Sequence, residues 1–189
     1  MNSELPPFKQ HEDWELLEAL MPYVRKLQEL AEQHNVPDIF QDNGGKLLQL
    51  ALVTSLKLLK PREGNDAVDA TGREYELKTV NIRYSAKRKQ QPQFTTHHHL
   101  NPTIIAKYRS VHWLFAVYDA IELSEIYFMT ADKLEPLFSQ WEKKWHDDGR
   151  KDINNPKIPM KFVKTHGTRV YPSLIDPEEI PRHRGEVET

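Results

Sequence analysis

The chain has 189 residues, of which 38% are hydrophobic, with no cysteine and a formal net charge of -2. This composition suffices for one folded domain with an appendage, and it excludes disulfides and thiolate metal sites. No apolar run approaches the roughly 18 residues that a membrane span needs, and the acidic start lacks the basic leader of a signal peptide. We therefore expect a cytoplasmic protein with no membrane partner.

The first half of the chain is predicted to contain two helices and a hairpin. Leucines at helical spacing predict a helix over residues 12–33, and a second helix is expected over 45–59, before Pro61. Two short strands, 67–68 and 75–77, then flank a glycine-containing turn.

The second half alternates between helices and strands. A short helix is expected over 102–109, a pair of strands over 111–118 and 121–129, a further helix over 131–145 and strands again over 158–171. Helices that flank a mixed central sheet make an α/β (α+β) domain. Residues 172–189, rich in Pro, Glu and Arg, are expected to form a flexible tail.

The segment EGNDAVDATGREYELK, residues 63–78, gathers acidic side chains around the predicted hairpin. Strand alternation places Glu76 and Lys78 on one face of their strand. If the hairpin is centred near Thr71, Asp66 lies opposite Glu76. Two carboxylates then converge beside one ammonium group.

Like charges across a strand pair are destabilising unless a cation or a proton lies between them. Hard oxygen ligands with room for water suit Mg²⁺, and the substrate would be a phosphate ester. Lys78 could orient or help to deprotonate the attacking water, or neutralise charge that develops on the phosphorus centre. The alternative is a solvated hairpin with an ordinary surface salt bridge.

The charge is distributed unevenly along the chain. Residues 79–110 contain six Lys and Arg and no acid, and residues 150–171 contain six more against one acid, whereas the first 32 residues hold seven acids and three bases. Such segregation is typical of a protein with one face toward phosphate. A basic loop that only promotes solubility is the alternative.

Two polar stretches are candidates for contacts with a partner. In Thr95-Thr96-His97-His98-His99, an extended backbone turns the outer two histidines one way and His98 the other, which argues against a shared metal ion and for a loop that reads bases. The amides of Asn154-Asn155 suit pairing with adenine, although Asn-Asn-Pro is more often a simple turn.

The motifs in this order resemble the PvuII family of type II restriction endonucleases, which are PD-(D/E)XK nucleases. Asp66 followed by Glu76-Leu77-Lys78 matches the metal-site pattern, and the match extends over most of the chain. The words that carry it are QDNGGKLLQ, EGNDAVD, EYELK, THHH followed by NP, IIAKYR and KDINNPKIP.

The resemblance implies a role for each matching position. Asp66 and Glu76 would bind catalytic Mg²⁺, Lys78 would be catalytic, Glu63 would lie near the metal and Tyr108 would line the active site. Residues in the DNA grooves would be the following: Asp42 near the minor groove, and Thr95, Thr96, His97, His98, His99, Asn154 and Asn155 in the major groove.

The resemblance also implies a homodimer that cuts double-stranded DNA at CAGCTG to blunt ends with 5′-phosphates, as part of a restriction-modification system. Residues 1–171 would form one restriction-endonuclease-like domain, with helical dimerisation at about 12–60 and catalysis and recognition at 61–171. Two departures concern recognition: the 82–94 loop is longer and more basic than in the family, and Thr95 stands where a serine is expected.

Three alternatives remain open at this point. A DNA-binding protein that does not cut would have no use for Asp66, Glu76 and Lys78 together. A histidine-dependent metal enzyme would hold its ion near residues 97–99. A repair or junction nuclease could share the same metal centre.

Overall fold

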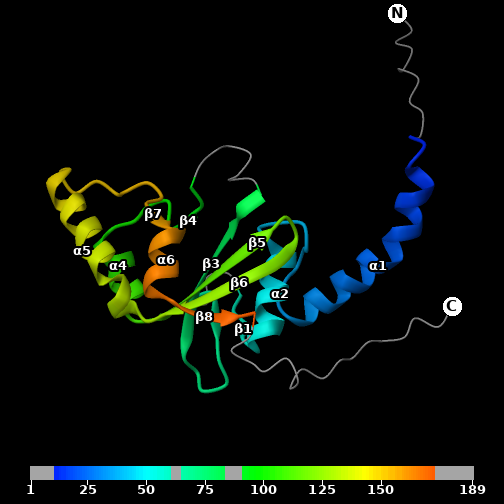
Figure 1. Ribbon diagram of the computed structural model, residues 1–189, viewed down its shortest axis with the longest axis horizontal. Helices are drawn as coiled ribbons and strands as arrows, with labels where there is room; N and C mark the ends of the chain where they lie inside the picture. The colour runs from blue at the N-terminus through cyan, green and yellow to red at the C-terminus, as the bar shows by residue number, and fades with distance from the viewer. Residues whose placement is uncertain (1–10, 61–64, 84–90, 173–189) are drawn as a thin grey trace, which may run out of the picture.

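A six-stranded mixed sheet forms the centre of the computed structural model, which describes residues 11–60, 65–83 and 91–172. The strand order is β1-β2-β3-β5-β6-β8, and a separate two-stranded sheet joins β4 to β7 (Figure 1). The strands are β1 (Lys57–Leu58), β2 (Ala67–Val68), β3 (Glu74–Asn81), β4 (Gln93–Thr95), β5 (His112–Asp119), β6 (Glu122–Met129), β7 (Lys157–Pro159) and β8 (Thr168–Tyr171). The helices are α1 (Trp14–Gln33), α2 (Gly44–Thr54), α4 (Pro102–Arg109), α5 (Ala131–Asp147) and α6 (Met160–His166).

One parallel pairing determines how the active-site half of the sheet is built. β3 runs parallel to β5, in a register that pairs Glu76 with Trp113 and Lys78 with Phe115, while the other neighbours in the sheet are antiparallel. Parallel neighbours need a crossover connection. Here that connection contains β4 and α4.

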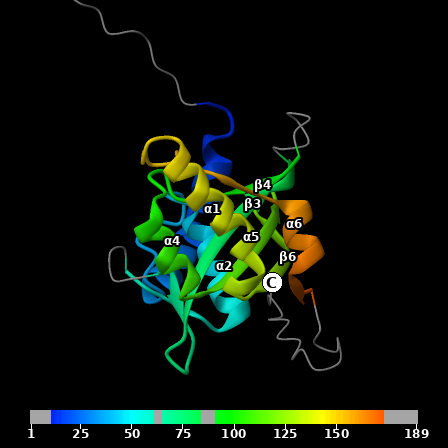
Figure 2. The ribbon, with the colours of Figure 1, turned by 90° about the vertical axis from the view of Figure 1, so that its left-hand side faces the viewer.

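The helices cover the two faces of the sheet with separate hydrophobic cores. On one face α4, α5 and α6 pack through residues such as Tyr108, Phe138 and Val163 (Figure 2). On the other face the end of α1 and the body of α2 pack through Ala31 and Leu48. Strand β5 is buried on both sides, which explains its nearly continuous apolar sequence.

Helix α4 is fixed at both of its ends. Asn101 caps its start by accepting the Ile104 N–H at 3.2 Å, next to Pro102 in the first turn. At the other end, the Arg109 guanidinium bonds to both Glu135 and Glu142 of α5. Tyr108 therefore projects from a helix with little freedom to move.

Most of the predicted elements are confirmed, including the mixed sheet flanked by helices and the helix over 102–109. Two predictions are wrong. The helix expected over 45–59 ends at Thr54, because Ser55 adopts a left-handed conformation (φ 56°) and the chain then enters β1, which pairs with β2. The strands expected over 158–171 are interrupted by α6, whose buried Val163 packs into the core.

No helix among the described residues is long and apolar enough to cross a membrane. The tail predicted at 172–189 lies outside the described residues, apart from its first position.

Candidate active site

The β2–β3 hairpin brings the two predicted carboxylates opposite each other. Ala67 pairs with Tyr75 and Val68 with Glu74, so the same register places Asp66 across from Glu76, as predicted. The turn is held by Asp69, which accepts the backbone N–H of Thr71 and of Arg73. These hydrogen bonds, with that of the Thr71 hydroxyl first among them, lower the pKa of Asp69 to about 2. The register of the hairpin is therefore fixed by its turn.

The Asp66 carboxylate is oriented by backbone. One of its oxygens accepts the Leu77 N–H at 2.8 Å. The backbone N–H of Asp66 donates to the Tyr75 carbonyl at 3.1 Å, and the backbone carbonyl of Asp66 accepts the Leu59 N–H at 3.0 Å. Because these three hydrogen bonds hold Asp66, the position of its second carboxylate oxygen is fixed as well.

The side chains of Glu76 and Lys78 lie on the α4 side of the sheet and are mostly buried. Glu76 is only 7% exposed, and one of its carboxylate oxygens is paired with the Lys78 ammonium. That ammonium lies 5.9 Å from the ring centroids of both Tyr108 and Trp113. A solvated hairpin with an ordinary surface salt bridge is therefore the wrong interpretation of this segment.

Burial dominates the electrostatics of the site. It raises the pKa of Glu76 above its ordinary value, against the opposing effect of the Lys78 charge, and the nearby Asp66 charge raises that pKa further. The Tyr108 hydroxyl interacts with the Glu76 carboxylate, and burial together with the charges of Glu76 and Asp66 raises the pKa of Tyr108. Tyr108 consequently stays a neutral hydrogen-bond donor at neutral pH.

The donor set of this site suits a hard divalent cation. The two carboxylates influence the same tyrosine, and Asp66 raises the pKa of Glu76, so a cation between them would relieve a repulsion that is present in the fold. Mg²⁺ takes only one or two protein carboxylates and completes its shell with water and phosphate. Among the described residues no group of three or more His, Asp and Glu is arranged to hold a metal ion. Asp66 and Glu76 could therefore serve as the protein ligands of a hard divalent cation that completes its shell with water and phosphate.

The second predicted cluster is assembled by β4 and β7, a connection that the sequence did not reveal. Phe94 pairs with Ile158, and Leu100 exchanges two backbone hydrogen bonds with Ile153, so the histidine run lies beside the asparagine loop. The Asn155 N–H also donates to the His97 carbonyl at 3.1 Å. We call residues 93–99 and 153–159 together the β4–β7 unit.

Side chains of the β4–β7 unit divide into exposed and structural ones. Thr95, Asn154 and all three histidines are exposed, whereas Thr96 is 8% exposed and donates its hydroxyl to the Pro156 carbonyl at 2.7 Å. The buried amide oxygen of Asn155 has no hydrogen-bond partner within the described part of the chain. Thr96 thus holds the unit together while its neighbours face outward.

The histidines have a defined orientation. The rings of His97 and His99 are in edge-to-face contact with centroids 6.4 Å apart, although residues 98–99 form a turn and not the extended segment that was predicted. The His99 backbone N–H donates to Nδ1 of His97 at 3.0 Å. Because Nδ1 accepts this bond, the ring proton of neutral His97 is on Nε2, where it can be donated to a ligand.

One cavity of about 580 Å³ connects the two clusters. Its walls include Asp66 and Lys78 from the hairpin, Thr95 and Thr96 from the β4–β7 unit, and Asp42 from the loop before α2. The cavity therefore brings together residues that the sequence placed in separate motifs. Glu63 and most of the 82–94 loop lie outside the described residues.

Two residues at the site were not predicted. Trp113 was assigned only to an apolar strand, and its place over Lys78 follows from the parallel pairing of strands that are far apart in sequence. Lys60 lines the cavity although it was assigned to no motif. Its position next to the acidic segment was the available signal.

Comparison with known protein families agrees with this geometry. A family model described as restriction endonuclease PvuII matches residues 12–171, which include both clusters and α1.

Replacing Glu76 by Gln should raise the thermal stability of the metal-free protein at neutral pH, because it removes a buried charge whose ionisation the fold disfavours. Because the pKa of Glu76 is raised in the folded state, the ionised form of Glu76 lowers the free energy of unfolding. This loss of stability is complete once the pH exceeds the raised pKa. The effect disappears as the pH falls to the ordinary value near 4.5. Thermal melts between those limits should show the advantage of Glu76→Gln shrinking toward acid.

The matched control is Glu122→Gln, at an exposed position that begins β6. A variant at Glu76 that is less stable at neutral pH would mean that pairing with Lys78 outweighs burial.

Proposed function

Because the chain belongs to the restriction endonuclease PvuII family, and is therefore a type II site-specific deoxyribonuclease, we propose that it cuts double-stranded DNA at CAGCTG with Mg²⁺, leaving blunt ends with 5′-phosphates. The observation that carries this proposal is that Asp66, Lys78 and the exposed Thr95 line the same cavity. A phosphate held at the hairpin would have its neighbouring bases against the β4–β7 unit.

In the proposed mechanism Asp66 and Glu76 would hold the ion. When bound, Mg²⁺ supplies Lewis-acid polarisation of the scissile phosphate. Lys78, held by Glu76 and flanked by two aromatic rings, orients the attacking water and neutralises charge that builds on the phosphate oxygens. Tyr108 donates toward the Glu76 carboxylate and keeps it in place. Glu63, assigned near the metal by resemblance, remains part of the proposal.

Sequence would be read by the β4–β7 unit in the major groove. Nε2–H of His97 is a donor suited to the O6 or N7 acceptors of guanine, and the amides of Asn154 and Asn155 suit adenine. Thr95 supplies a hydroxyl to the same groove. Asp42, which also lines the cavity, would face the minor groove. A cytoplasmic location, expected from the sequence, belongs to this proposal.

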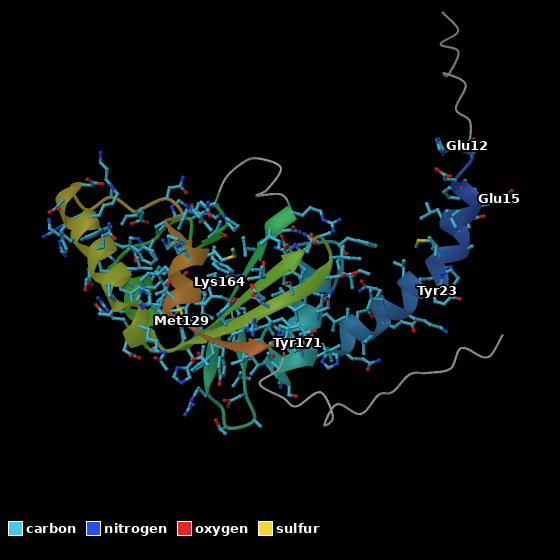
Figure 3. All side chains as sticks on the ribbon, viewed as in Figure 1. Glu12, Glu15, Tyr23, Met129, Lys164 and Tyr171 are labelled. Atoms are coloured by element: carbon cyan, nitrogen blue, oxygen red, sulfur yellow. The ribbon has the colours of Figure 1, made fainter. Side chains whose placement is uncertain are left out.

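A homodimer is the proposed working form. α1 extends away from the sheet, with Glu15 in its first turn at the far end and Tyr23 near its middle (Figure 3). One side of the helix carries a stripe of exposed apolar residues, of which Tyr23 is 70% exposed and Leu20 is 50% exposed. Residues of the stripe are Leu16, Leu17, Leu20, Tyr23, Leu27 and Leu30. An exposed apolar stripe of this size, on a helix about 30 Å long, indicates a surface that is buried by a partner. If the partner is a second copy of the chain, the dimer would bring two identical active sites to the two strands of a palindrome.

Digestion of a DNA of known sequence with Mg²⁺, followed by mapping of the ends, tests the proposed activity. We expect one blunt cut within CAGCTG. Lys78→Gln, which keeps an amide donor for Glu76 but removes the charge, should slow cleavage roughly 100-fold or more and leave specific binding within a few-fold. Lys133→Gln, at an exposed position of α5, is the matched control.

Other outcomes of the digestion would each change the proposal. Cuts at another hexamer would replace CAGCTG while retaining the enzyme class. Cuts without sequence preference would favour a repair or junction nuclease. Near-normal cleavage by Lys78→Gln would remove that residue from the mechanism.

The base-reading assignment predicts a specific effect of His97→Asn. The asparagine oxygen can accept the His99 N–H in place of Nδ1, so the loop keeps its shape, but the Nε2–H donor is removed. Discrimination against single-base variants of the site should fall by roughly 1 to 3 kcal/mol for each base that the side chain no longer reaches. Competition cleavage among such variants measures this.

His166→Asn, at an exposed position of α6, provides the control. Equal weakening on every sequence, with an unchanged preference, would show that His97 only orders the loop.

The dimer predicts that Leu20→Asp with Leu27→Asp weakens self-association at least about 100-fold, since each buried and unpaired carboxylate costs several kcal/mol. Sedimentation of the full chain should then show monomers, and cleavage of both strands should disappear with the dimer. Arg25→Asp adds the same side chain on the opposite side of α1, where it should leave the dimer intact. A double variant that sediments like the unmutated protein would assign the stripe another role.

A further inference from the structure

Lys60 occupies a position beside the active site that no motif assigns. It follows Leu59, whose N–H donates to the Asp66 carbonyl at 3.0 Å, and so it continues the path of β1 past the metal-site carboxylate. Continuation of the β1–β2 register places it opposite Asn65. The backbone around Lys60 is therefore tied to the same strands that hold Asp66.

The surroundings of Lys60 differ from those of the catalytic lysine. Both line the cavity, but Lys78 is paired with the buried Glu76, whereas Lys60 is exposed and forms no ion pair with any acid among the described residues. The other charged side chains of the described cavity wall are Asp38, Asp42 and Asp66. Of the two lysines on the described cavity wall, Lys60 is thus the one whose charge is available to a ligand.

A DNA strand that places one phosphate at Asp66 and Lys78 must carry its next phosphates along the walls of the same cavity. Three lining carboxylates would repel those phosphates, so a mobile ammonium beside Asp66 has a clear electrostatic role. Lysine acts on phosphate as a point charge and needs no fixed geometry. An exposed side chain of this kind suits a backbone contact better than the reading of a base.

We propose that Lys60 binds a DNA phosphate that flanks the scissile one, and so positions the strand at Asp66 and Lys78. This inference rests on the proposed nuclease function. Lys60 is a positioning residue in this role and takes no part in the bond-making step. Its removal should therefore weaken binding to all sequences alike, because phosphates carry no sequence information.

Salt titrations of DNA binding test the role of Lys60. The full chain is titrated with a CAGCTG duplex, without metal ion so that no strand is cut, at several salt concentrations. Lys60→Ala should reduce the slope of log K against log salt by about 0.9 for each phosphate that the protein no longer neutralises. The same reduction should appear on a duplex that lacks the site. Lys60→Arg, which keeps the charge, should retain the slope.

Lys57→Ala is the matched control, because Lys57 is also an exposed lysine, on β1, but does not line the cavity. We expect its salt slope to equal that of the unmutated protein. Lys60→Ala should need a higher DNA concentration than the unmutated protein to reach its maximal single-turnover rate, whereas Lys57→Ala should not, because only Lys60 contacts a flanking phosphate. Thermal melts confirm that each exposed substitution leaves the fold intact.

The results separate this inference from the function on which it rests. If the unmutated protein cuts DNA but Lys60→Ala keeps its full salt slope, Lys60 binds no phosphate and the inference is overturned. A slowed single-turnover rate with an unchanged slope would overturn it as well. If the unmutated protein cuts no DNA with Mg²⁺, the proposed function fails first.

Discussion

The parallel pairing of β3 with β5 is the constraint on which the rest of the site depends. Parallel neighbours cannot be joined by a tight turn, so the chain must cross over between Asn81 and His112. That crossover carries β4, the histidine run and α4. One topological requirement therefore supplies both the exposed unit beside the cavity and the tyrosine that covers Glu76.

Burial then changes the electrostatics of an otherwise ordinary Glu–Lys pair. In water a Glu and a Lys two residues apart on a strand would interact weakly, but here Glu76 is buried and the Lys78 ammonium lies beside the aromatic rings of Tyr108 and Trp113, which strengthens the interaction. The fold disfavours ionised Glu76 and holds it near a second carboxylate all the same. Such stored repulsion is typical of functional sites, because a cation can relieve it.

The sequence predicted the features that neighbouring residues determine, and it missed the contacts between segments that are distant in the chain. The Asp66–Glu76 alignment followed from a turn that Gly72 (φ 84°) and Asp69 define, and α4 followed from Asn101 and Pro102. The contact between the Trp113 ring and the Lys78 ammonium could not be derived, and neither could the pairing of β4 with β7, since each joins segments that lie far apart in the chain. The helix α6 was missed because a short apolar run fits either period.

Net charge is a poor guide to the partner of this protein, and the cavity explains why. Its wall combines three carboxylates with two lysines, one of which is neutralised by Glu76. Without a cation the carboxylates at the hairpin oppose any phosphate, and with one bound they attract it. In the proposed enzyme, metal and DNA must therefore strengthen each other's binding, because each removes the charge that the other would have to face. The carboxylates at the hairpin would thus make DNA bind more tightly when the metal is present than when it is absent.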